Sequence, residues 1–195
     1  IALNTVLRFA VLAGLMAFIE HFESRLKRYA VLAKRDDLTQ SYNRVGLDEY
    51  AVRAIDRALS TGNSLTIAMI DCDKFKHIND TLGHGIGDQV LRSIARRLKA
   101  CMRESDTVSR HGGDEFVMVL PECPLEDAIR VAERLRQAVA EWAGRGGITL
   151  SISIGLGQAP QHGHDLDSVL ERVDSAMYRC KLSFGKGGIQ LVDAV

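Results

Sequence analysis

Two adjacent carboxylates follow two glycines in residues 112–115, whose sequence is Gly-Gly-Asp-Glu. A β-prone run, residues 107–109, leads into this segment and a second, residues 116–120, leads out, which predicts a β-hairpin with the acids at its tip. Glycine allows positive φ and a close approach of a ligand to the backbone. Neighbouring acids repel each other unless a cation lies between them and an anionic ligand. The tip is therefore either a site for a cation and an anionic ligand or a solvated acidic turn.

A second pair of acids follows an apolar run. Residues 65–70 are typical of a buried strand, and Asp71 and Asp73 come directly after them. Carboxylates at a strand end suit a hard cation, because Mg2+ binds one or two carboxylates together with phosphate oxygens. The alternative is that these acids cap the next helix.

Groups that could bind guanine come next. The Watson–Crick edge of guanine has donors at N1 and N2 and an acceptor at O6, so the Asp88 carboxylate can accept from both donors and the Asn79 amide can meet both kinds of group. Adenine would leave the carboxylate unpaired, which predicts guanine selectivity. Asp88 could instead be an acid in the first turn of a helix whose inward residues are Ile86, Val90, Ile94 and Leu98.

Arg103 and Asp106 lie just before the expected hairpin. A guanidinium can form two parallel hydrogen bonds with phosphate or with the Hoogsteen edge of guanine, and Asp106 can accept from N1 and N2. The pair suits a ligand that carries both guanine and phosphate. The alternative is an exposed ion pair, which contributes little stability.

The elements that must position these groups mix without strict βαβ alternation, so the sequence predicts the α+β class. Helices are expected at 45–59, 125–143 and 166–182, with inward residues Leu47, Ala51, Ile55 and Leu59 in the first and Ala128, Ala132, Leu135, Val139 and Trp142 in the second. Residues 148–155 alternate with period two, which predicts a strand with one buried face. Residues 189–192 are the last expected strand.

Residues 1–35 form a separate, helical unit in this interpretation. The apolar run from Phe9 to Ile19 is either the end of a transmembrane helix or part of a soluble helix, and no signal peptide is evident. Apolar residues then recur in steps of three and four, which predicts a parallel coiled coil, with a single amphipathic helix as the alternative. This seam comprises Leu12, Leu15, Ile19, Phe22, Leu26, Tyr29 and Ala33. A basic cluster from Arg25 to Arg35 suits the cytoplasmic side of a membrane.

Composition narrows the class of protein. The chain has 195 residues and a formal net charge of zero, which argues against nucleic-acid binding through a basic surface. Its four cysteines lack metal-binding or CxxC spacing and are expected to be reduced thiols. Because the first residue is Ile, we expect the chain to be part of a longer protein.

Residues 112–116 spell Gly-Gly-Asp-Glu-Phe, and from Asp36 to Val192 the chain resembles the GGDEF family, the diguanylate cyclases. Further blocks in the family's order are Asp36 to Arg44, Asp71 to Asp80, Gly83 to Asp88, Arg103 to Asp106, and Tyr178 to Gly187. The chain departs from the family pattern at Gln40 and Ser41, where Gly and Leu are usual. It also has one residue inserted before Gly185, and Gly187 stands where Asn is usual.

The resemblance implies a central, mostly antiparallel sheet flanked by helices, similar to polymerase palms and nucleotidyl cyclases, in residues 36–195 after the N-terminal helix 1–35. It implies the condensation of two GTP into cyclic di-GMP and two pyrophosphates, with Mg2+ or Mn2+ as cofactor.

The same resemblance implies roles for particular residues. The metal ligands would be Asp71, Asp114 and the carbonyl of Cys72, and Lys76 would stabilise charge while Asp114 or Glu115 assists deprotonation of the ribose 3′-hydroxyl. Substrate would bind Phe75, Asn79, His84, Asp88, Gly112, Gly113, Lys181 and Lys186. Arg103 and Asp106 would form a product-inhibition site.

The implied partners are GTP, cyclic di-GMP as product and inhibitor, a second copy of the chain, and an upstream sensor domain. The implied location is cytoplasmic, with a tether to the membrane through the N-terminal helix. Two alternatives stay open: a degenerate GGDEF domain that binds GTP or cyclic di-GMP without turnover, and a cyclase or polymerase with a different product.

Overall fold

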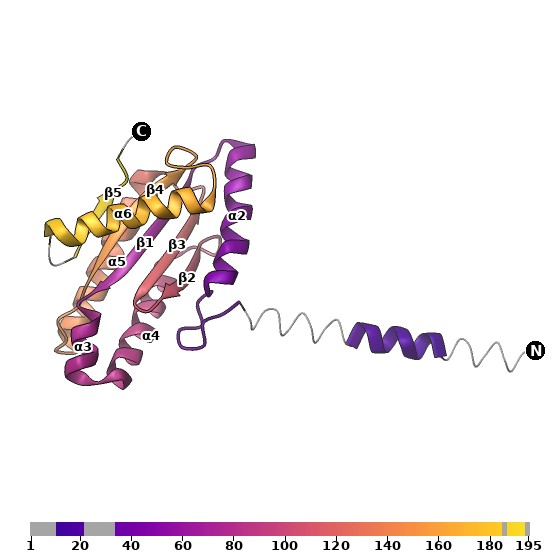
Figure 1. The fold of residues 1–195 in the computed structure, drawn as a ribbon, viewed down its shortest axis with the longest axis horizontal. Helices are drawn as coiled ribbons and strands as arrows, with labels where there is room; N and C mark the ends of the chain where they lie inside the picture. The colour runs from indigo at the N-terminus through magenta and orange to yellow at the C-terminus, as the bar shows by residue number, and fades with distance from the viewer. Residues whose placement is uncertain (1–10, 22–33, 185–186, 194–195) are drawn as a thin grey trace, which may run out of the picture.

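A five-stranded sheet forms the centre of the computed structural model, which describes residues 11–21, 34–184 and 187–193 (Figure 1). The strands are β1 (Leu65–Asp73), β2 (Thr107–Gly112), β3 (Glu115–Pro121), β4 (Ser151–Ala159) and β5 (Gly188–Leu191), in the order β2-β3-β1-β4-β5. Only the β4–β5 pair is parallel among these neighbours. The predicted α+β class and mostly antiparallel sheet are confirmed.

Helices cover both faces of this sheet. They are α2 (Arg44–Thr61), α3 (Phe75–Leu82), α4 (His84–Ala100), α5 (Leu125–Arg145) and α6 (Leu166–Phe184). Alternate residues of β1 enter different cores: Ile70 packs with residues of α4 and α5, whereas Met69 packs with residues of α2 and α6. Because β1 is central and covered twice, its sequence is a nearly continuous apolar run.

The prediction that β4 has one buried face is wrong. Ile152, Ile154 and Leu156 fill the core beside α5, and the alternate positions are buried as well. These positions are Ser153, Gly155 and Gly157, which are small because α6 lies directly against them. Ser and Gly alternate with Ile and Leu along a strand both where they face solvent and where a helix packs closely on them. The sequence pattern therefore predicted only one buried face for β4.

Two expected inward residues lie elsewhere. Leu59 is 43% exposed, because the buried stripe of α2 continues from Ile55 to Ala58 instead. Trp142 is only partly buried, and the Arg97 guanidinium lies over its ring at 4.6 Å. The strand expected at 148–155 begins at Ser151 and runs on to Ala159.

Residues 11–21 form a helical segment in which every residue is exposed. Of the predicted coiled-coil seam, Leu12, Leu15 and Ile19 fall in this segment, and the positions from Phe22 to Ala33 lie outside the described residues. Within the described part of the chain, no helix is long and apolar enough to cross a membrane. The division into residues 1–35 and 36–195 stays a prediction.

Residues 34–43, which we call the entry turn, lead into α2. The turn closes on itself where the Asp36 N–H donates to the Ser41 carbonyl at 2.9 Å, and its Tyr42 bridges to Ser109 of β2. Gln40 has φ 55°, in the left-handed region that favours glycine, which explains why the family pattern has Gly at this position. The turn therefore forms despite the departure at Gln40.

Candidate active site

Asp71 and Asp114 come together from the end of β1 and the tip of the β2–β3 hairpin. The pairing of β1 with β3 places Asp71 opposite Glu115, and the Cys72 N–H donates to the Asp114 carbonyl at 3.3 Å. Gly113, with φ 42°, makes the turn before Asp114. The predicted hairpin is confirmed, and the two sets of acids found in the sequence lie at one edge of the sheet.

The ionisation of Asp71 is set by its surroundings. Burial of Asp71, which is 5% exposed, raises the pKa of its carboxyl to about 6; the nearby Asp114 adds to the shift, and Lys181 opposes it. Lys181 Nζ lies 2.6 Å from Asp71 Oδ2. Lys181, expected from the family as a triphosphate contact, thus pairs with a carboxylate of the site.

Neither Asp71 nor Asp73 caps the next helix. The N-cap residue of α3 is Lys74, whose side chain forms no capping hydrogen bond. The Asp73 carboxylate instead accepts from the hydroxyls of Ser151 and Ser153 at 2.6 and 2.7 Å, which ties the end of β1 to β4. The helix-cap alternative is wrong, and Asp71 is left to the site.

The donors at this edge suit a hard cation. Two carboxylates together with phosphate oxygens and water are a usual set for Mg2+. Burial raises the pKa of the Cys72 thiol well above its usual value, so Cys72 can contribute its carbonyl oxygen and not a thiolate. The described residues contain no group of three or more His, Cys, Asp or Glu side chains that could hold a metal.

The expected guanine-binding groups lie on α3 and α4. Asp88 is the fifth residue of α4, which begins at His84, so the alternative of a first-turn acid is wrong. A Cβ placed on Gly87 would lie 1.9 Å from Asn79 Oδ1 and 3.2 Å from Phe75 Cζ. The side chains of Asn79 and Phe75 therefore lie against α4 at Gly87, the residue before Asp88.

Other expected site residues lie on α3, on α4 and in the hairpin. Lys76 and His84 are exposed, Glu115 is half-buried next to the hairpin tip, and Gly112 lies at a bulge in the β2–β3 pairing. Lys186 lies outside the described residues. Arg110, which the sequence did not single out for chemistry, donates to the Gly113 carbonyl at 2.9 Å.

Arg103 and Asp106 lie away from the acids. Asp106 Oδ2 accepts from the main-chain N–H of Arg103 at 2.8 Å, and the two side chains form no ion pair in the described structure. The surface ion-pair alternative is therefore wrong.

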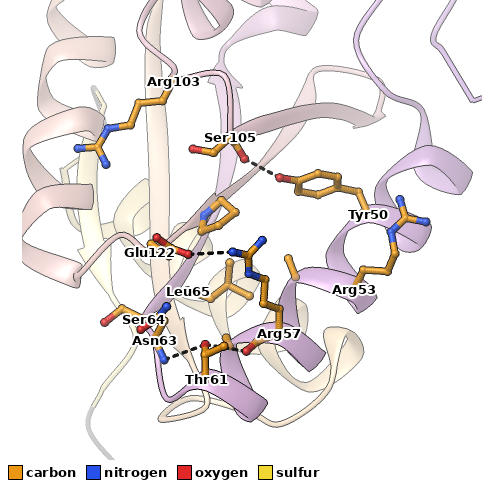
Figure 2. A pocket seen from close by; sticks show the side chains of 13 residues that line it. Tyr50, Arg53, Arg57, Thr61, Asn63, Ser64, Leu65, Arg103, Ser105 and Glu122 are labelled. Atoms are coloured by element: carbon orange, nitrogen blue, oxygen red, sulfur yellow. Dashed lines mark hydrogen bonds and ion pairs between the residues drawn. The ribbon is translucent and has the colours of Figure 1, made fainter.

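The Arg103 side chain lines a cavity of about 590 Å3, which also contains Leu65, the first residue of β1, whereas Asp71 lies toward the other end of that strand (Figure 2). Among the residues that line this cavity, Arg57 pairs with Glu122 at 3.5 Å, and the Tyr50 hydroxyl donates to the Ser105 carbonyl at 2.5 Å (Figure 2). Tyr50 was not predicted, because a tyrosine on an amphipathic helix carries no signal of a partner 55 residues away.

A mostly antiparallel sheet with helices on both faces, carrying two acids at one edge, has the palm-like architecture of nucleotidyl cyclases. The chain belongs to the GGDEF family: the family description "Diguanylate cyclase, GGDEF domain" matches residues 33–186.

Curated relatives and solved structures agree with this assignment. Response regulator PleD of Caulobacter vibrioides is 36% identical over 171 residues, covering 85% of this chain and 38% of PleD. Diguanylate cyclase DgcM of Escherichia coli is 43% identical over 124 residues, covering 63% of this chain and 30% of DgcM. The chain thus spans about a third of the length of these relatives.

The coiled coil and GGDEF domain of DgcB from Caulobacter crescentus, solved in complex with cyclic di-GMP, has a TM-score of 0.80 and 28% identity. That match covers 93% of this chain and 97% of the DgcB chain. The GGDEF domain of PA1120 from Pseudomonas aeruginosa has a TM-score of 0.75 and 35% identity, covering 82% and 94%.

Proposed function

We propose that this chain is a diguanylate cyclase that joins two GTP molecules into cyclic di-GMP and releases two pyrophosphates. One observation carries the proposal: Asp71 and Asp114 lie together at the sheet edge, with Asp71 paired to Lys181 at 2.6 Å. Paired carboxylates beside a cationic side chain suit phosphoryl transfer, which depends on positioning and charge stabilisation. The names of the relatives support the choice of product.

Each side chain then has a task. Asp71, Asp114 and the Cys72 carbonyl would hold Mg2+ or Mn2+, which supplies charge neutralisation at the phosphates. Asn79 and Asp88 would bind guanine, with His84 and Phe75 beside them, and Gly112 and Gly113 would let the nucleotide approach the backbone. Lys76, Lys181 and Lys186 would pair with phosphate oxygens. Asp114 or Glu115 would take the proton of the attacking 3′-hydroxyl.

Lys181 would serve both Asp71 and the triphosphate. Its ammonium lies 2.6 Å from Asp71 Oδ2 and neutralises that carboxylate, which burial would otherwise leave poorly solvated. In a complex with GTP and the metal, Asp71 would be a metal ligand and Lys181 would pair with a phosphate oxygen.

The test is the mass of the product formed from GTP and Mg2+ in a single turnover. Asp71→Asn and Asp114→Asn should each abolish turnover while the fold is kept, because each removes an anionic ligand of similar shape. Asp127→Asn, on the exposed face of α5, is the matched control. Near-wild-type rates in either site variant at saturating Mg2+ would contradict the assignment.

Synthesis needs two domains that face each other, since each would hold one GTP. We propose that the N-terminal seam brings two copies together and receives the signal of an upstream domain. Leu12, Leu15 and Ile19 are exposed on the helical segment, at 56%, 52% and 46%, and unburied apolar side chains at heptad spacing suit a second helix. The likeness to the coiled coil and GGDEF domain of DgcB supports this assembly.

We further propose that cyclic di-GMP inhibits the enzyme at Arg103 and Asp106. Arg103 lines the cavity near the start of β1, its guanidinium points away from the other lining side chains, and it forms no ion pair with Asp106 in the described structure, so it is available to a ligand (Figure 2). Arg103→Ala should keep the initial rate and lose the slowing that accumulating product causes, with product binding weakened about tenfold or more. Progress curves and calorimetry with added cyclic di-GMP measure both, and equal inhibition of variant and wild type would contradict the site.

A regulatory GGDEF domain without turnover is the second candidate. Ser41 favours it, because this buried residue stands where the family has Leu and its hydroxyl has no hydrogen-bond partner among the described residues. In that case GTP or cyclic di-GMP would bind and no product would form. The product-mass experiment also separates a cyclase or polymerase with another product.

A further inference from the structure

Arg110, in the first strand of the hairpin, joins the entry turn to the hairpin tip. Its Nε and Nη2 donate to the Gly113 carbonyl at 2.9 and 2.7 Å, and its Nη1 donates to the two carboxylate oxygens of Asp36 at 3.3 and 3.2 Å. The side chains of Arg110 and Asp36 are only 17% and 21% exposed. A planar guanidinium bonded on two sides has little freedom to move.

The Gly113 carbonyl belongs to the peptide group that precedes Asp114. The peptide group after Asp114 is also held, because the Cys72 N–H donates to the Asp114 carbonyl at 3.3 Å. Asp114 thus lies between two restrained peptide groups, one fixed by Arg110 and one by β1. Since glycine has the widest backbone freedom, the peptide after Gly113 depends on such a bond for its orientation.

The entry turn is attached to the domain by several other bonds. The Arg110 N–H donates to the Tyr42 carbonyl at 2.8 Å, and the Tyr42 N–H donates to the Val108 carbonyl at 3.1 Å. Lys99 Nζ donates to the Gln40 carbonyl at 2.8 Å. Loss of the Asp36 charge should therefore leave the turn in place while it loosens the guanidinium.

The ionisation of Asp36 fits this arrangement. Burial works against the charged form, but the hydrogen bonds from Thr39 and the charge of Arg110 prevail and lower the pKa of the Asp36 carboxyl. Asp36 Oδ1 accepts from the Thr39 N–H at 2.8 Å and from its hydroxyl at 2.6 Å. Thr39 of the entry turn therefore holds the Asp36 carboxylate in place, and this carboxylate holds the Arg110 guanidinium.

We propose that Arg110 is a positioning residue of the active site and that Asp36 holds it in place, so that a displacement of the entry turn reaches Asp114 through one side chain. The kinetic part of this inference rests on the proposed cyclase activity. The restraint on the hairpin tip can be measured without turnover.

The test compares Asp36→Asn with Glu133→Gln, which removes the charge of another Arg-paired carboxylate, on α5, bonded to Arg136 at 2.9 and 2.7 Å. In the nucleotide-free protein, amide hydrogen exchange in residues 111–117 should rise about fivefold in Asp36→Asn and stay unchanged in Glu133→Gln. In the active enzyme, kcat should fall about tenfold with KM for GTP little changed, because Asp114 is misplaced and binding is kept.

A double variant tests whether both residues act through one contact. Arg110→Gln should raise tip exchange, and adding Asp36→Asn to it should cause little further change. Four results would each overturn the proposal. Tip exchange could stay unchanged in Asp36→Asn, or rise as much in Glu133→Gln as in Asp36→Asn. The effects of Asp36→Asn and Arg110→Gln on tip exchange could add in the double variant, or kcat of Asp36→Asn could stay unchanged in an active enzyme. If the wild type makes no cyclic di-GMP, the cyclase assignment fails, and the exchange experiment still decides whether Arg110 positions the tip.

Discussion

At the scale of single residues, Gly87 matters because it has no side chain and so leaves room for the Asn79 amide. A methyl group there would meet Asn79 Oδ1 at 1.9 Å, whereas one on Gly85, in the same helix, would meet nothing within 4 Å. We expect Gly87→Ala to push the Asn79 amide away from Asp88 and to weaken GTP binding about tenfold, as for a lost hydrogen bond. Gly85→Ala is the control, and equal affinities in calorimetry would show that Asn79 needs no such support.

His162 gives the fold a pH dependence. The ring is buried, and its Nδ1 accepts from the Gln158 N–H at 2.8 Å. Burial, with a smaller effect of Arg172, lowers the pKa of His162 below the usual value near 6.5. Because the folded state binds the proton less tightly than the unfolded state, the stability that depends on the neutral ring is present above about pH 6.5 and is lost as the pH falls below it.

The measurement is Tm between pH 8 and pH 5 for the wild type and His162→Asn, whose amide oxygen can replace Nδ1 as acceptor. The stability advantage of the wild type should be largest at pH 8 and should narrow toward pH 5. His164→Asn, at an exposed position two residues on, is the control. A gap in Tm that does not change with pH would show that the ring stays neutral throughout or is protonated equally in both states.

The sequence predicted those site residues whose neighbours in the chain form a recognisable pattern. Asp71 follows an apolar run and Asp114 follows two glycines, so the sequence alone predicted both. Lys181 contacts Asp71 across a separation of 110 positions in the sequence. Arg110 contacts Asp36 across a separation of 74 positions. Nothing local marks such contacts, since they depend on how α6 and the entry turn pack on the sheet.

At the scale of elements, the packing of α6 on β4 determines where Lys181 lies. A Cβ on Gly155 would lie 2.0 Å from the Val173 carbonyl oxygen and 2.6 Å from the Met177 nitrogen. Both are backbone atoms of α6, so the helix itself would have to shift. The sequence showed only a glycine in a strand, which does not reveal which helix crosses it.

Gly155→Ala should therefore lower the free energy of unfolding by about 1–3 kcal/mol, as overpacking usually does. It should also reduce turnover, because the displaced α6 carries Lys181 away from Asp71. Gly144→Ala on α5, where a methyl group meets nothing within 4 Å, should be neutral or stabilise by up to about 1 kcal/mol. Urea denaturation measures both, and equal stabilities would mean that α6 adjusts without cost.

Hydrophobic periodicity predicted most elements because their inward faces are broad and regular. It failed where packing partners decide, as at Leu59, which lies on the apolar side of α2 by pattern but beyond the residues that the sheet covers. In β4, the positions of Gly155 and Gly157 had the spacing of residues that face solvent, but these glycines lie against α6 and leave room for its close packing. Pattern therefore predicted which elements exist, and the close approaches between them required the structure.

At the scale of the whole molecule, activity should depend on how two copies meet. One domain has one candidate nucleotide site, and the exposed seam residues Leu15 and Ile19 lie on a helical segment before the domain. Leu15→Glu with Ile19→Glu would bury charge in a helix pair, which is costly, and should raise the dimer dissociation constant at least about tenfold. Specific activity should then fall at low protein concentration and recover when the enzyme is concentrated.

The matched control is Ala13→Glu with Ala17→Glu, which adds the same charges to the same segment at exposed positions off the seam. Since Glu and Ala are both good helix formers, this variant should keep the helix and the dimer. Mass measurements by light scattering, taken over the same concentrations as the rates, separate lost assembly from lost chemistry. If the seam variant keeps the dimer mass and a specific activity independent of concentration, the two domains meet through another surface, and the seam has no part in synthesis.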